Sequence, residues 1–231
     1  KKYFFKGLDK NKKKIIIFPH CFYDFPHRYR SMIFNDFFEH ANYFMKLSET
    51  HKQYEWLYKP HPHSLKGHIN IHKQLLSKYP SIKYIPKEVS HKQLLNLDIK
   101  CAITNHGTVA HEYAAFNIPV ISTGDNPHIN YKFSLNIKTQ KQLDKIFKNL
   151  DINLKKINFN KKEIYEFLYM HYKYPFQEIP QYELLKDSFF AKKNIKANNS
   201  SKILNYYIKH DKFNSTKIHS YINSFLKFYN L

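Results

Sequence analysis

The sequence predicts a doubly wound α/β domain with a parallel sheet, followed by a helical C-terminal appendage. Two observations lead to this prediction. Over residues 13–150, short β-branched runs alternate with segments of helical spacing, which favours right-handed crossovers and a sheet covered on both faces. Over residues 151–231, helical spacing and polar breaks continue without a convincing strand. We therefore expect one sheet domain and one helical extension.

The first elements follow one another closely. "KKIIIFPHC" (13–21) is a β-branched run that ends at a proline and suits a buried strand. Residues 35–52 place apolar side chains at helical spacing. "YEWLYKPHP" (54–62) predicts a second strand, stopped by two prolines. A helix over 68–79 and a short strand over 82–86 continue the alternation.

The later elements repeat this pattern. We expect a short helix over 90–97, a strand over 99–104, a helix over 107–116, a strand over 118–123 and a helix over 139–150. Side chains suited to N-caps precede three of the predicted helices: Asn35 or Asp36, Ser90 and Thr139. In parallel sheets of this kind, ligands bind at the carboxyl ends of the strands.

Composition narrows the class of protein. A chain of 231 residues with 42% hydrophobic residues can bury a substantial core. No apolar run is long enough to span a membrane, and the N-terminus lacks the apolar core of a signal peptide. With Cys21 and Cys101 as the only cysteines, a reducing compartment is the default. We therefore expect a cytoplasmic protein.

The formal charge of +20 raises the question of an anionic partner. The basic residues are almost all lysines spread along the chain, and Arg28 and Arg30 are the only arginines. Because arginine is favoured for bidentate recognition of phosphates and bases, this composition disfavours nucleic acid. The charge favours an anionic substrate, and it leaves open peripheral association with an anionic membrane at the inner face of the cell.

Polar side chains follow three of the predicted strands. His20 comes after the first strand, Lys59 and His61 after the second, and His106 and Thr108 after the fourth. Since the carboxyl ends of parallel strands meet at one edge of the sheet, we expect these five residues to converge on one cationic pocket.

The turn at "NHGTVAHE" fits a phosphate. Gly107 would let a ligand approach the backbone, and Thr108 would add a hydroxyl beside the first N–H groups of a helix. Glu112, one helical turn further, could meet ribose hydroxyls. The alternatives are that Gly107 only forms the turn, Thr108 only caps the helix and Glu112 is solvated. The glycine-rich loops of dinucleotide-binding and P-loop proteins are absent.

His61 stands between two prolines, which fix the direction of its imidazole. A histidine there can neutralise a phosphate or protonate a departing one, with Lys59 adding charge. The alternative is a surface histidine in a proline-rich turn. Without HExxH, paired CxxC or clustered carboxylates, we expect neither a metal nor a cofactor.

Together, "LYKPHP" and "ITNHGTVAHEYAAFNIPVIS" resemble the nucleotide-binding C-terminal half of GT-B glycosyltransferases. The most similar are bacterial capsule and surface-polysaccharide enzymes with a His-Pro motif after a strand. That group includes transferases that use CMP-sugars and polymerases that use CDP-glycerol. "FPHCFYDFPHRYR" also resembles an opening of capsule-biosynthesis proteins.

The resemblance implies a Rossmann-like, nucleotide-sugar-binding domain over 13–150, with residues 151–231 as a helical extension. It implies that His61 contacts the donor phosphate or nucleotide, that the turn from His106 through Gly107 to Thr108 sits at the phosphate, and that Glu112 meets the ribose. It also implies an acceptor-binding N-terminal half outside this chain. His20 and Asp24 are then the local candidates for catalysis.

The function expected from these features is transfer of a sugar from a CMP-, CDP- or UDP-activated donor to a saccharide or lipid-linked saccharide acceptor, without a metal. Two alternatives stay open. One is transfer of a phosphate-containing group from a CDP-activated donor to polysaccharide. The other is a non-enzymatic basic module at the membrane surface.

Overall fold

The computed structural model describes residues 5–23 and 32–173. The described residues up to Tyr165 belong to one compact unit, and a second unit begins at Glu166. Among the described residues, no helix combines the length and the apolar character needed to cross a bilayer. The predicted helices beyond residue 173 lie outside the described part of the chain.

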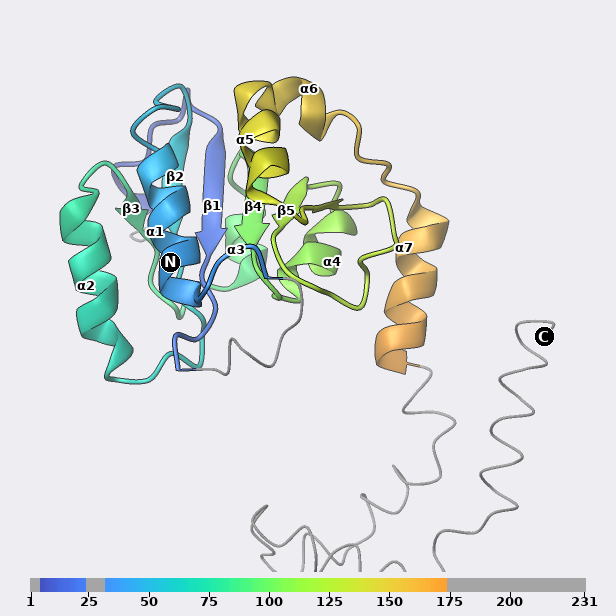
Figure 1. The fold of residues 1–231 in the computed structure, drawn as a ribbon, viewed down its shortest axis with the longest axis horizontal. Helices are drawn as coiled ribbons and strands as arrows, with labels where there is room; N and C mark the ends of the chain where they lie inside the picture. The colour runs from blue at the N-terminus through green and yellow to red at the C-terminus, as the bar shows by residue number, and fades with distance from the viewer. Residues whose placement is uncertain (1–4, 24–31, 174–231) are drawn as a thin grey trace, which may run out of the picture. The chain divides into compact units, whose positions relative to one another are not determined.

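A six-stranded sheet forms the centre of the first unit, in the order β3-β2-β1-β4-β5-β6 (Figure 1). Every neighbouring pair is parallel. The strands are β1 (Lys14–Phe18), β2 (Glu55–Tyr58), β3 (Lys83–Tyr84), β4 (Ile99–Thr104), β5 (Val120–Ser122) and β6 (Leu135–Asn136). This topology confirms the predicted doubly wound α/β fold. The sequence analysis missed β6, because Leu135 and Asn136 are neither β-branched nor aromatic.

Helices connect the consecutive strands from β1 to β5, and further helices follow β6. They are α1 (Phe37–Leu47), α2 (His68–Lys78), α3 (His91–Leu94), α4 (Val109–Ala114), α5 (Gln140–Lys148), α6 (Leu150–Leu154) and α7 (Lys161–Leu168), which continues as a π-helical segment, η3 (Tyr169–Lys173). Asp36, Ser90 and Thr139 accept the expected N-cap hydrogen bonds from Glu39, Gln93 and Gln142 N–H groups.

Four predicted strands are shorter in the structure than in the sequence analysis, and prolines end two of them. The strand expected over 13–21 ends at Phe18, and the strand expected over 54–62 ends at Tyr58. Pro19 and Pro60 explain both ends, since proline cannot donate a hydrogen bond to a sheet ladder. The polar residues that follow are therefore in loops at the edge of the sheet.

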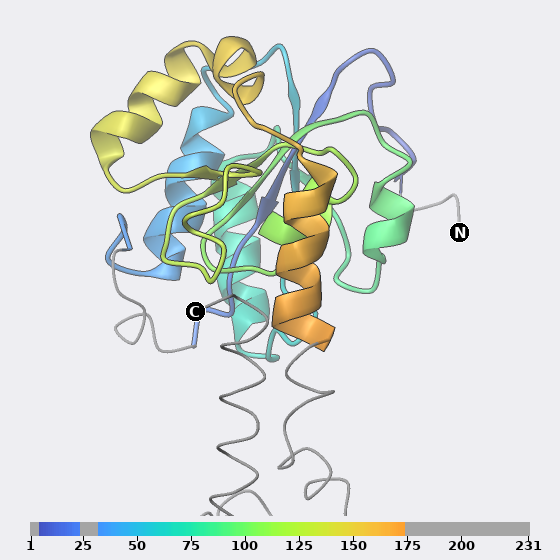
Figure 2. The ribbon, with the colours of Figure 1, turned by 90° about the vertical axis from the view of Figure 1, so that its right-hand side faces the viewer.

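Alternate residues of each strand pack on opposite faces. Ile15 and Ile17 of β1 join the core under α1, α2, α5 and α6, whereas Ile16 and Phe18 join the core under α3 and α4. In Figure 2, α1 and α5 lie on one side of the sheet and α3 on the other. Burial on both faces explains why the central strands read as continuous apolar runs.

The register of the sheet brings the loops after β1, β2 and β4 together. Ile17 is opposite Tyr58 on one side and Ile103 on the other, and Phe18 is opposite Thr104. The arrowheads of β1 and β4 point down in Figure 1, so the carboxyl edge of the sheet lies at the bottom of that view. Because β1 and β4 are adjacent, the order of the strands reverses between them, and ligands of such sheets bind at this point.

Candidate functional site

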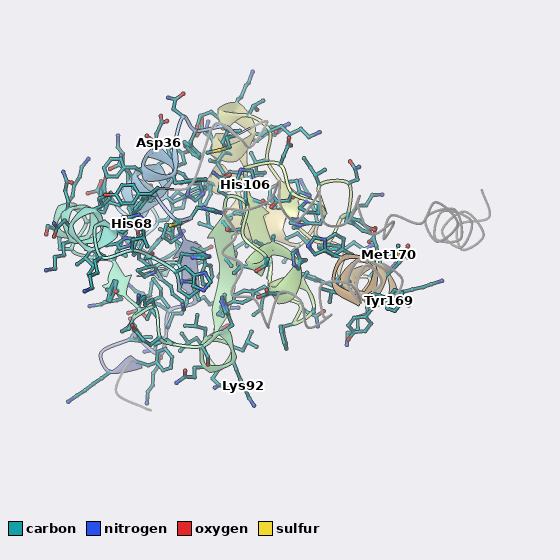
Figure 3. All side chains as sticks on the ribbon, turned by 90° about the horizontal axis from the view of Figure 1, so that it is seen from below. Asp36, His68, Lys92, His106, Tyr169 and Met170 are labelled. Carbon is teal, nitrogen blue, oxygen red and sulfur yellow. The ribbon has the colours of Figure 1, made fainter. Side chains whose placement is uncertain are left out.

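A pocket of about 210 Å³ opens at this edge. The five residues expected to converge there, His20, Lys59, His61, His106 and Thr108, all line it. The remaining lining residues come from the ends of β1 and β4, the two prolines beside His61, and the starts of α3 and α4: Phe18, Pro19, Pro60, Pro62, His91, Thr104, Gly107 and Val109. Figure 3 views the molecule from this side, with His106 labelled. None of these described lining residues is acidic.

Glu112, another predicted site residue, does not line the pocket. Glu112 is partly buried on α4, and its N–H group donates to the Thr108 carbonyl 3.0 Å away, one turn back. Asp24 lies outside the described residues.

The imidazole of His20 lines the pocket and contacts three other rings. It stacks on Phe37 of α1, with ring centroids 4.4 Å apart and planes 21° apart. It also stacks with His61, with ring centroids 6.0 Å apart and planes 22° apart, and meets His106 edge-on, with ring centroids 6.3 Å apart. Three loops that are distant in the sequence therefore bring three imidazoles together.

His61 has a defined tautomer. Its Nδ1 accepts a hydrogen bond from the backbone N–H of His63 at 3.2 Å. A backbone N–H can only donate, so Nδ1 carries no proton and the proton of the neutral ring is on Nε2. The rigid segment Pro60–Pro62 thus presents an imidazole that can donate from Nε2.

Lys59 is almost fully buried, and its Nζ donates to the carbonyl of Lys87 at 3.1 Å. Burial lowers the pKa of Lys59, while the nearby Glu88 carboxylate opposes this shift. The ammonium group consequently lies in a site where an incoming anion gains more from a positive charge than it would in water.

His91 is a pocket residue that the sequence analysis read only as part of a helix. Its ring stacks on Phe18, at 5.5 Å and 29°, and its Nδ1 is 3.0 Å from the Tyr113 hydroxyl. Burial lowers the pKa of His91, and the charge of Lys59 lowers it further. No sequence motif marked this residue, since only the crossover geometry brings α3 to the pocket.

Gly107 is needed for a close approach within the protein itself. Its N–H donates to Thr104 Oγ1 at 3.1 Å, and a Cβ at this position would lie 2.5 Å from the same oxygen. The Gly107 N–H is therefore engaged by Thr104. Thr108 is the N-cap residue of α4, but its side chain makes no cap hydrogen bond. The N–H groups of Thr108 and Val109 begin the helix and lack partners one turn back.

The position of His106 depends on a second glycine. His106 Nδ1 donates to the carbonyl of Asp125 at 2.5 Å, and a Cβ on Gly124 would lie 2.5 Å from His106 Cε1. Asn126 fixes the same turn, because its side-chain amide donates to the carbonyls of Gly124 and Asn105 at 2.7 and 3.2 Å. The segment "STGDNP" thus fixes the position of the His106 ring, a role that the sequence analysis missed.

His40 lies behind this cluster on α1. It is fully buried, and neither ring nitrogen has a hydrogen-bond partner among the described residues. Burial, followed by the charges of His106 and His20, lowers the pKa of His40 to about 3. Burial also lowers the pKa of His106. The imidazoles of His40 and His106 are therefore neutral at physiological pH.

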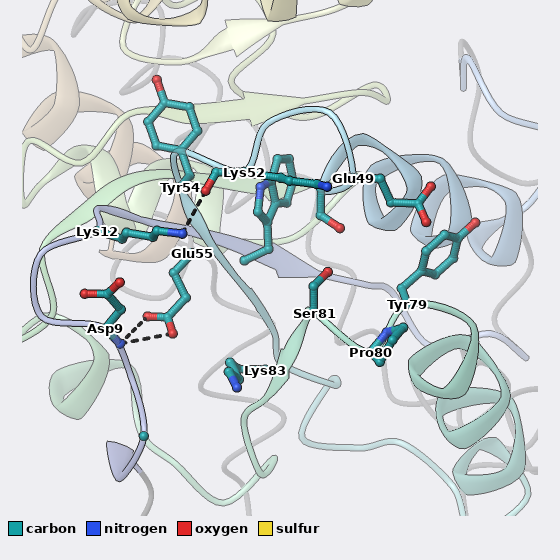
Figure 4. Close-up of a pocket in the computed structure, with 13 residues that line it drawn as sticks. Asp9, Lys12, Glu49, Lys52, Tyr54, Glu55, Tyr79, Pro80, Ser81 and Lys83 are labelled. Atoms are coloured by element: carbon teal, nitrogen blue, oxygen red, sulfur yellow. Dashed lines mark hydrogen bonds between the residues drawn. The ribbon is translucent and has the colours of Figure 1, made fainter.

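A larger hollow of about 590 Å³ lies at the opposite, amino-terminal edge of the sheet (Figure 4). Its lining mixes lysines with three carboxylates, those of Asp9, Glu49 and Glu55. Both Glu55 oxygens already accept from the N–H of Asp9 at 3.1 Å, and the buried Lys14 pairs with Glu55 at 3.3 Å. Carboxylates repel a phosphate, so we assign the candidate site to the smaller pocket at the carboxyl edge.

The described residues contain no group of three or more His, Cys, Asp or Glu side chains arranged to hold a metal ion. The groups available at the pocket are imidazoles, one ammonium group, hydroxyls and backbone N–H groups. Their common chemistry is hydrogen-bond donation and positive charge, which suits an anionic ligand.

No protein-family model matches the chain. No curated protein matches it either. Among solved structures, the chain is similar to a Thermosulfurimonas dismutans KpsC described as a beta Kdo 2,4 transferase, with 15% identity and a TM-score of 0.43 over 59% of this chain and 41% of that one.

Two further structures are similar at the same level. A KpsC from the same organism, described as a beta Kdo 2,7 transferase, has 16% identity and a TM-score of 0.41 over 57% of this chain and 40% of that one. The wall teichoic acid polymerase TagF has 17% identity and a TM-score of 0.43 over 70% and 40%. The chain thus spans about two fifths of the length of these structures. With TM-scores below 0.5, the assignment of the fold rests on the topology of this chain.

Proposed function

We propose that this chain is the donor-nucleotide-binding part of a glycosyltransferase of capsular or surface polysaccharide synthesis. The observation that carries the proposal is the meeting of two sequence motifs at one pocket. His61 of the His-Pro segment and the turn from His106 to Thr108 line the same hollow, at the switch point of the sheet. No acidic side chain of the described residues lines it.

The proposed ligand is the phosphate of a nucleotide-activated donor. Nε2–H of His61 donates to a phosphate oxygen, and the buried Lys59 supplies positive charge. Thr108 adds its hydroxyl and the N–H group that begins α4. We assign the nucleoside to the side of α4 that bears Glu112, where the carboxylate accepts hydrogen bonds from ribose hydroxyls.

In the proposed reaction, an acceptor hydroxyl oxygen forms a bond to the anomeric carbon of the donor sugar as the bond from that carbon to the phosphate oxygen breaks. The electron pair of the broken bond stays on the phosphate. Lys59, His61 and Thr108 stabilise this growing negative charge more strongly in the transition state than in the bound donor, which is what accelerates the step. No metal is required in this scheme.

The proton of the acceptor hydroxyl needs a base. His20 is the described candidate, because its imidazole lies between His61 and Phe37 on the pocket wall. Asp24, four residues further along the sequence, is the second candidate. We place the acceptor-binding half, which can supply a base of its own, outside this chain.

Thermal unfolding of the 231-residue chain with CMP, CDP or UDP tests nucleotide binding. A ligand at about 100 times its Kd stabilises the folded state by about 2.7 kcal/mol, which raises Tm by roughly 5–10 °C for a domain of this size. His61→Ala is expected to remove most of the shift. His63→Ala is the matched control, because His63 is in the same loop but does not line the pocket. The same shift in wild type and His61→Ala would refute the role of His61.

The transferred group is a separate question. A CMP-sugar or UDP-sugar that raises Tm beyond its free nucleotide supports sugar transfer. Transfer of a phosphate-containing group from a CDP-activated donor is the alternative, and an additional shift with CDP-glycerol alone would favour it.

A further inference from the structure

A patch of exposed apolar and basic side chains lies at the beginning of α2. Tyr23, Leu65 and Ile69 are 61%, 56% and 49% exposed. Lys66 and Lys73 are exposed beside them. We call these five residues the α2 patch. Single exposed apolar residues are ordinary, but three together with flanking lysines mark an interaction surface.

The hydrogen bonds at the start of α2 bring these side chains together. His68 N–H donates to the Leu65 carbonyl at 3.0 Å and Ile69 N–H to the Lys66 carbonyl at 3.1 Å, so residues 65–69 form a helical turn that leads into α2. Leu65, Ile69 and Lys73 then follow at intervals of four, on one helical face.

Tyr23 reaches this turn from the loop after β1. Its ring centroid is 4.3 Å from that of His68, and its hydroxyl would lie 3.1 Å from a Cβ on Gly67. The ring therefore lies against the turn that carries Leu65 and Ile69, and the absence of a side chain at Gly67 makes room for it.

The segment that carries four of the five patch residues has charged side chains of one sign. Residues 56–87 contain six lysines and no aspartate or glutamate. Lys87, from the loop after β3, reaches back to the Ser64 carbonyl with its Nζ at 3.5 Å and adds a third exposed lysine. This segment contrasts with the hollow at the amino-terminal edge, where carboxylates and lysines alternate (Figure 4).

The α2 patch lies at the same edge of the sheet as the candidate site. Ser64 N–H donates to the His61 carbonyl at 2.9 Å, so the turn at His61 leads directly into the patch. In the view onto this edge, His68 of α2 and His106 of the pocket are both visible (Figure 3).

We propose that the α2 patch binds the surface of an anionic lipid bilayer. The lysines match the negative charge of the headgroups, at roughly a fivefold gain in binding for each lysine at the surface. Transfer of Tyr23, Leu65 and Ile69 from water into the interfacial region of the bilayer is favourable, because tyrosine and aliphatic side chains are both stabilised there. A soluble polyanion would match the lysines equally well but would leave the three apolar side chains in water.

This inference goes beyond the proposed function, because binding to a bilayer requires no nucleotide. It also has a geometric consequence. A bilayer on the α2 patch lies beside the mouth of the pocket, so an acceptor carried on a membrane lipid is presented at the edge where the donor phosphate is proposed to bind.

Co-sedimentation of the 231-residue chain with vesicles tests the inference. Vesicles of phosphatidylcholine alone are compared with vesicles that also contain phosphatidylglycerol, and binding is expected only to the second kind. Lys66→Gln/Lys73→Gln is expected to weaken binding about 20-fold, and Leu65→Ser/Ile69→Ser about tenfold or more. All four positions are exposed, so the melting temperature should stay within the range of the wild type.

Matched controls carry the same substitutions elsewhere. Lys141→Gln/Lys145→Gln on α5 and Phe116→Ser/Ile152→Ser are exposed pairs away from the patch, and vesicle binding should change by less than about threefold. If both patch variants bind vesicles like the wild type, the inference is wrong. It is also overturned if only the lysine variant loses binding, because the surface would then recognise anionic polymers rather than a bilayer. Equal binding to both kinds of vesicle would contradict the assigned role of the lysines.

Discussion

Protonation of His40 should destabilise the folded chain in mild acid. This histidine is fully buried on α1, next to Phe34 and Phe44, with ring centroids at 5.4 and 4.9 Å. Burial lowers its pKa from 6.5 to about 3. The unfolded chain then binds a proton at a higher pH than the folded chain does. The stability that neutral His40 contributes to the folded state is therefore present above about pH 6.5 and is lost progressively as the pH falls toward the folded-state pKa.

The expected loss follows from these two values. His40 has a pKa of about 6.5 in the unfolded chain and about 3 in the folded chain. Acidification from about pH 7.5 to about pH 5 therefore lowers the free energy of unfolding by about 2 kcal/mol. The loss continues at lower pH until the folded state also takes up the proton. For a domain with a stability of roughly 5–15 kcal/mol, this is a measurable fraction.

Urea unfolding of wild type and His40→Leu at the two pH values isolates this group. The variant places an apolar side chain beside the two phenylalanines and cannot titrate, so its loss of stability on acidification should be about 2 kcal/mol smaller than that of the wild type. Phe44→Leu is the control, because it disturbs the same core without removing a titratable group and should lower stability equally at both pH values. A His40→Leu variant that loses as much stability as the wild type would refute the reasoning.

Three further predictions concern the pocket. Gly124→Ala places a methyl group against His106. We expect it to weaken CDP binding about tenfold or more in calorimetry and to leave the far-UV circular dichroism spectrum unchanged. Unaltered affinity would show that His106 need not hold its position. Gly107→Ala should destabilise the chain through its contact with Thr104, and a double-mutant cycle with Thr104→Ala should recover part of the loss; strictly additive effects would count against this contact. Because burial lowers the pKa of His106 and His91, a bound phosphate should raise both pKa values, so that CDP binding takes up protons and tightens as the pH falls below about 7. Calorimetry in buffers of different ionisation enthalpy measures the uptake, which should be smaller in His106→Asn; equal uptake in both proteins would contradict the assignment.

Most of the fold could be predicted because its central elements have a clear period. The runs at β1 and β4 are buried on both faces, so they are continuously apolar, and the prolines at 19 and 60 mark where ladder bonding stops. The edge of the sheet is different. β6 has only two residues, and its pairing with β5 is set by the tertiary structure rather than by a local pattern.

The convergence of His20, Lys59 and His61 could be predicted because parallel strands bring their carboxyl ends to one edge. His40 and Gly124 could not be found in this way. His40 lies in the middle of a helix, where its sequence spacing is that of a core residue, and the importance of Gly124 depends on a contact with His106 from a different loop. Such contacts across loops leave no periodic signal.

The most direct test of the central claim is calorimetric titration of the chain with CDP and with cytidine. We predict that CDP binds, that cytidine binds at least tenfold more weakly because it lacks the phosphates, and that His61→Ala reduces CDP affinity by a similar factor while His63→Ala does not. Equal affinities for CDP and cytidine, or equal CDP affinities for wild type and His61→Ala, would contradict a phosphate site between β1 and β4.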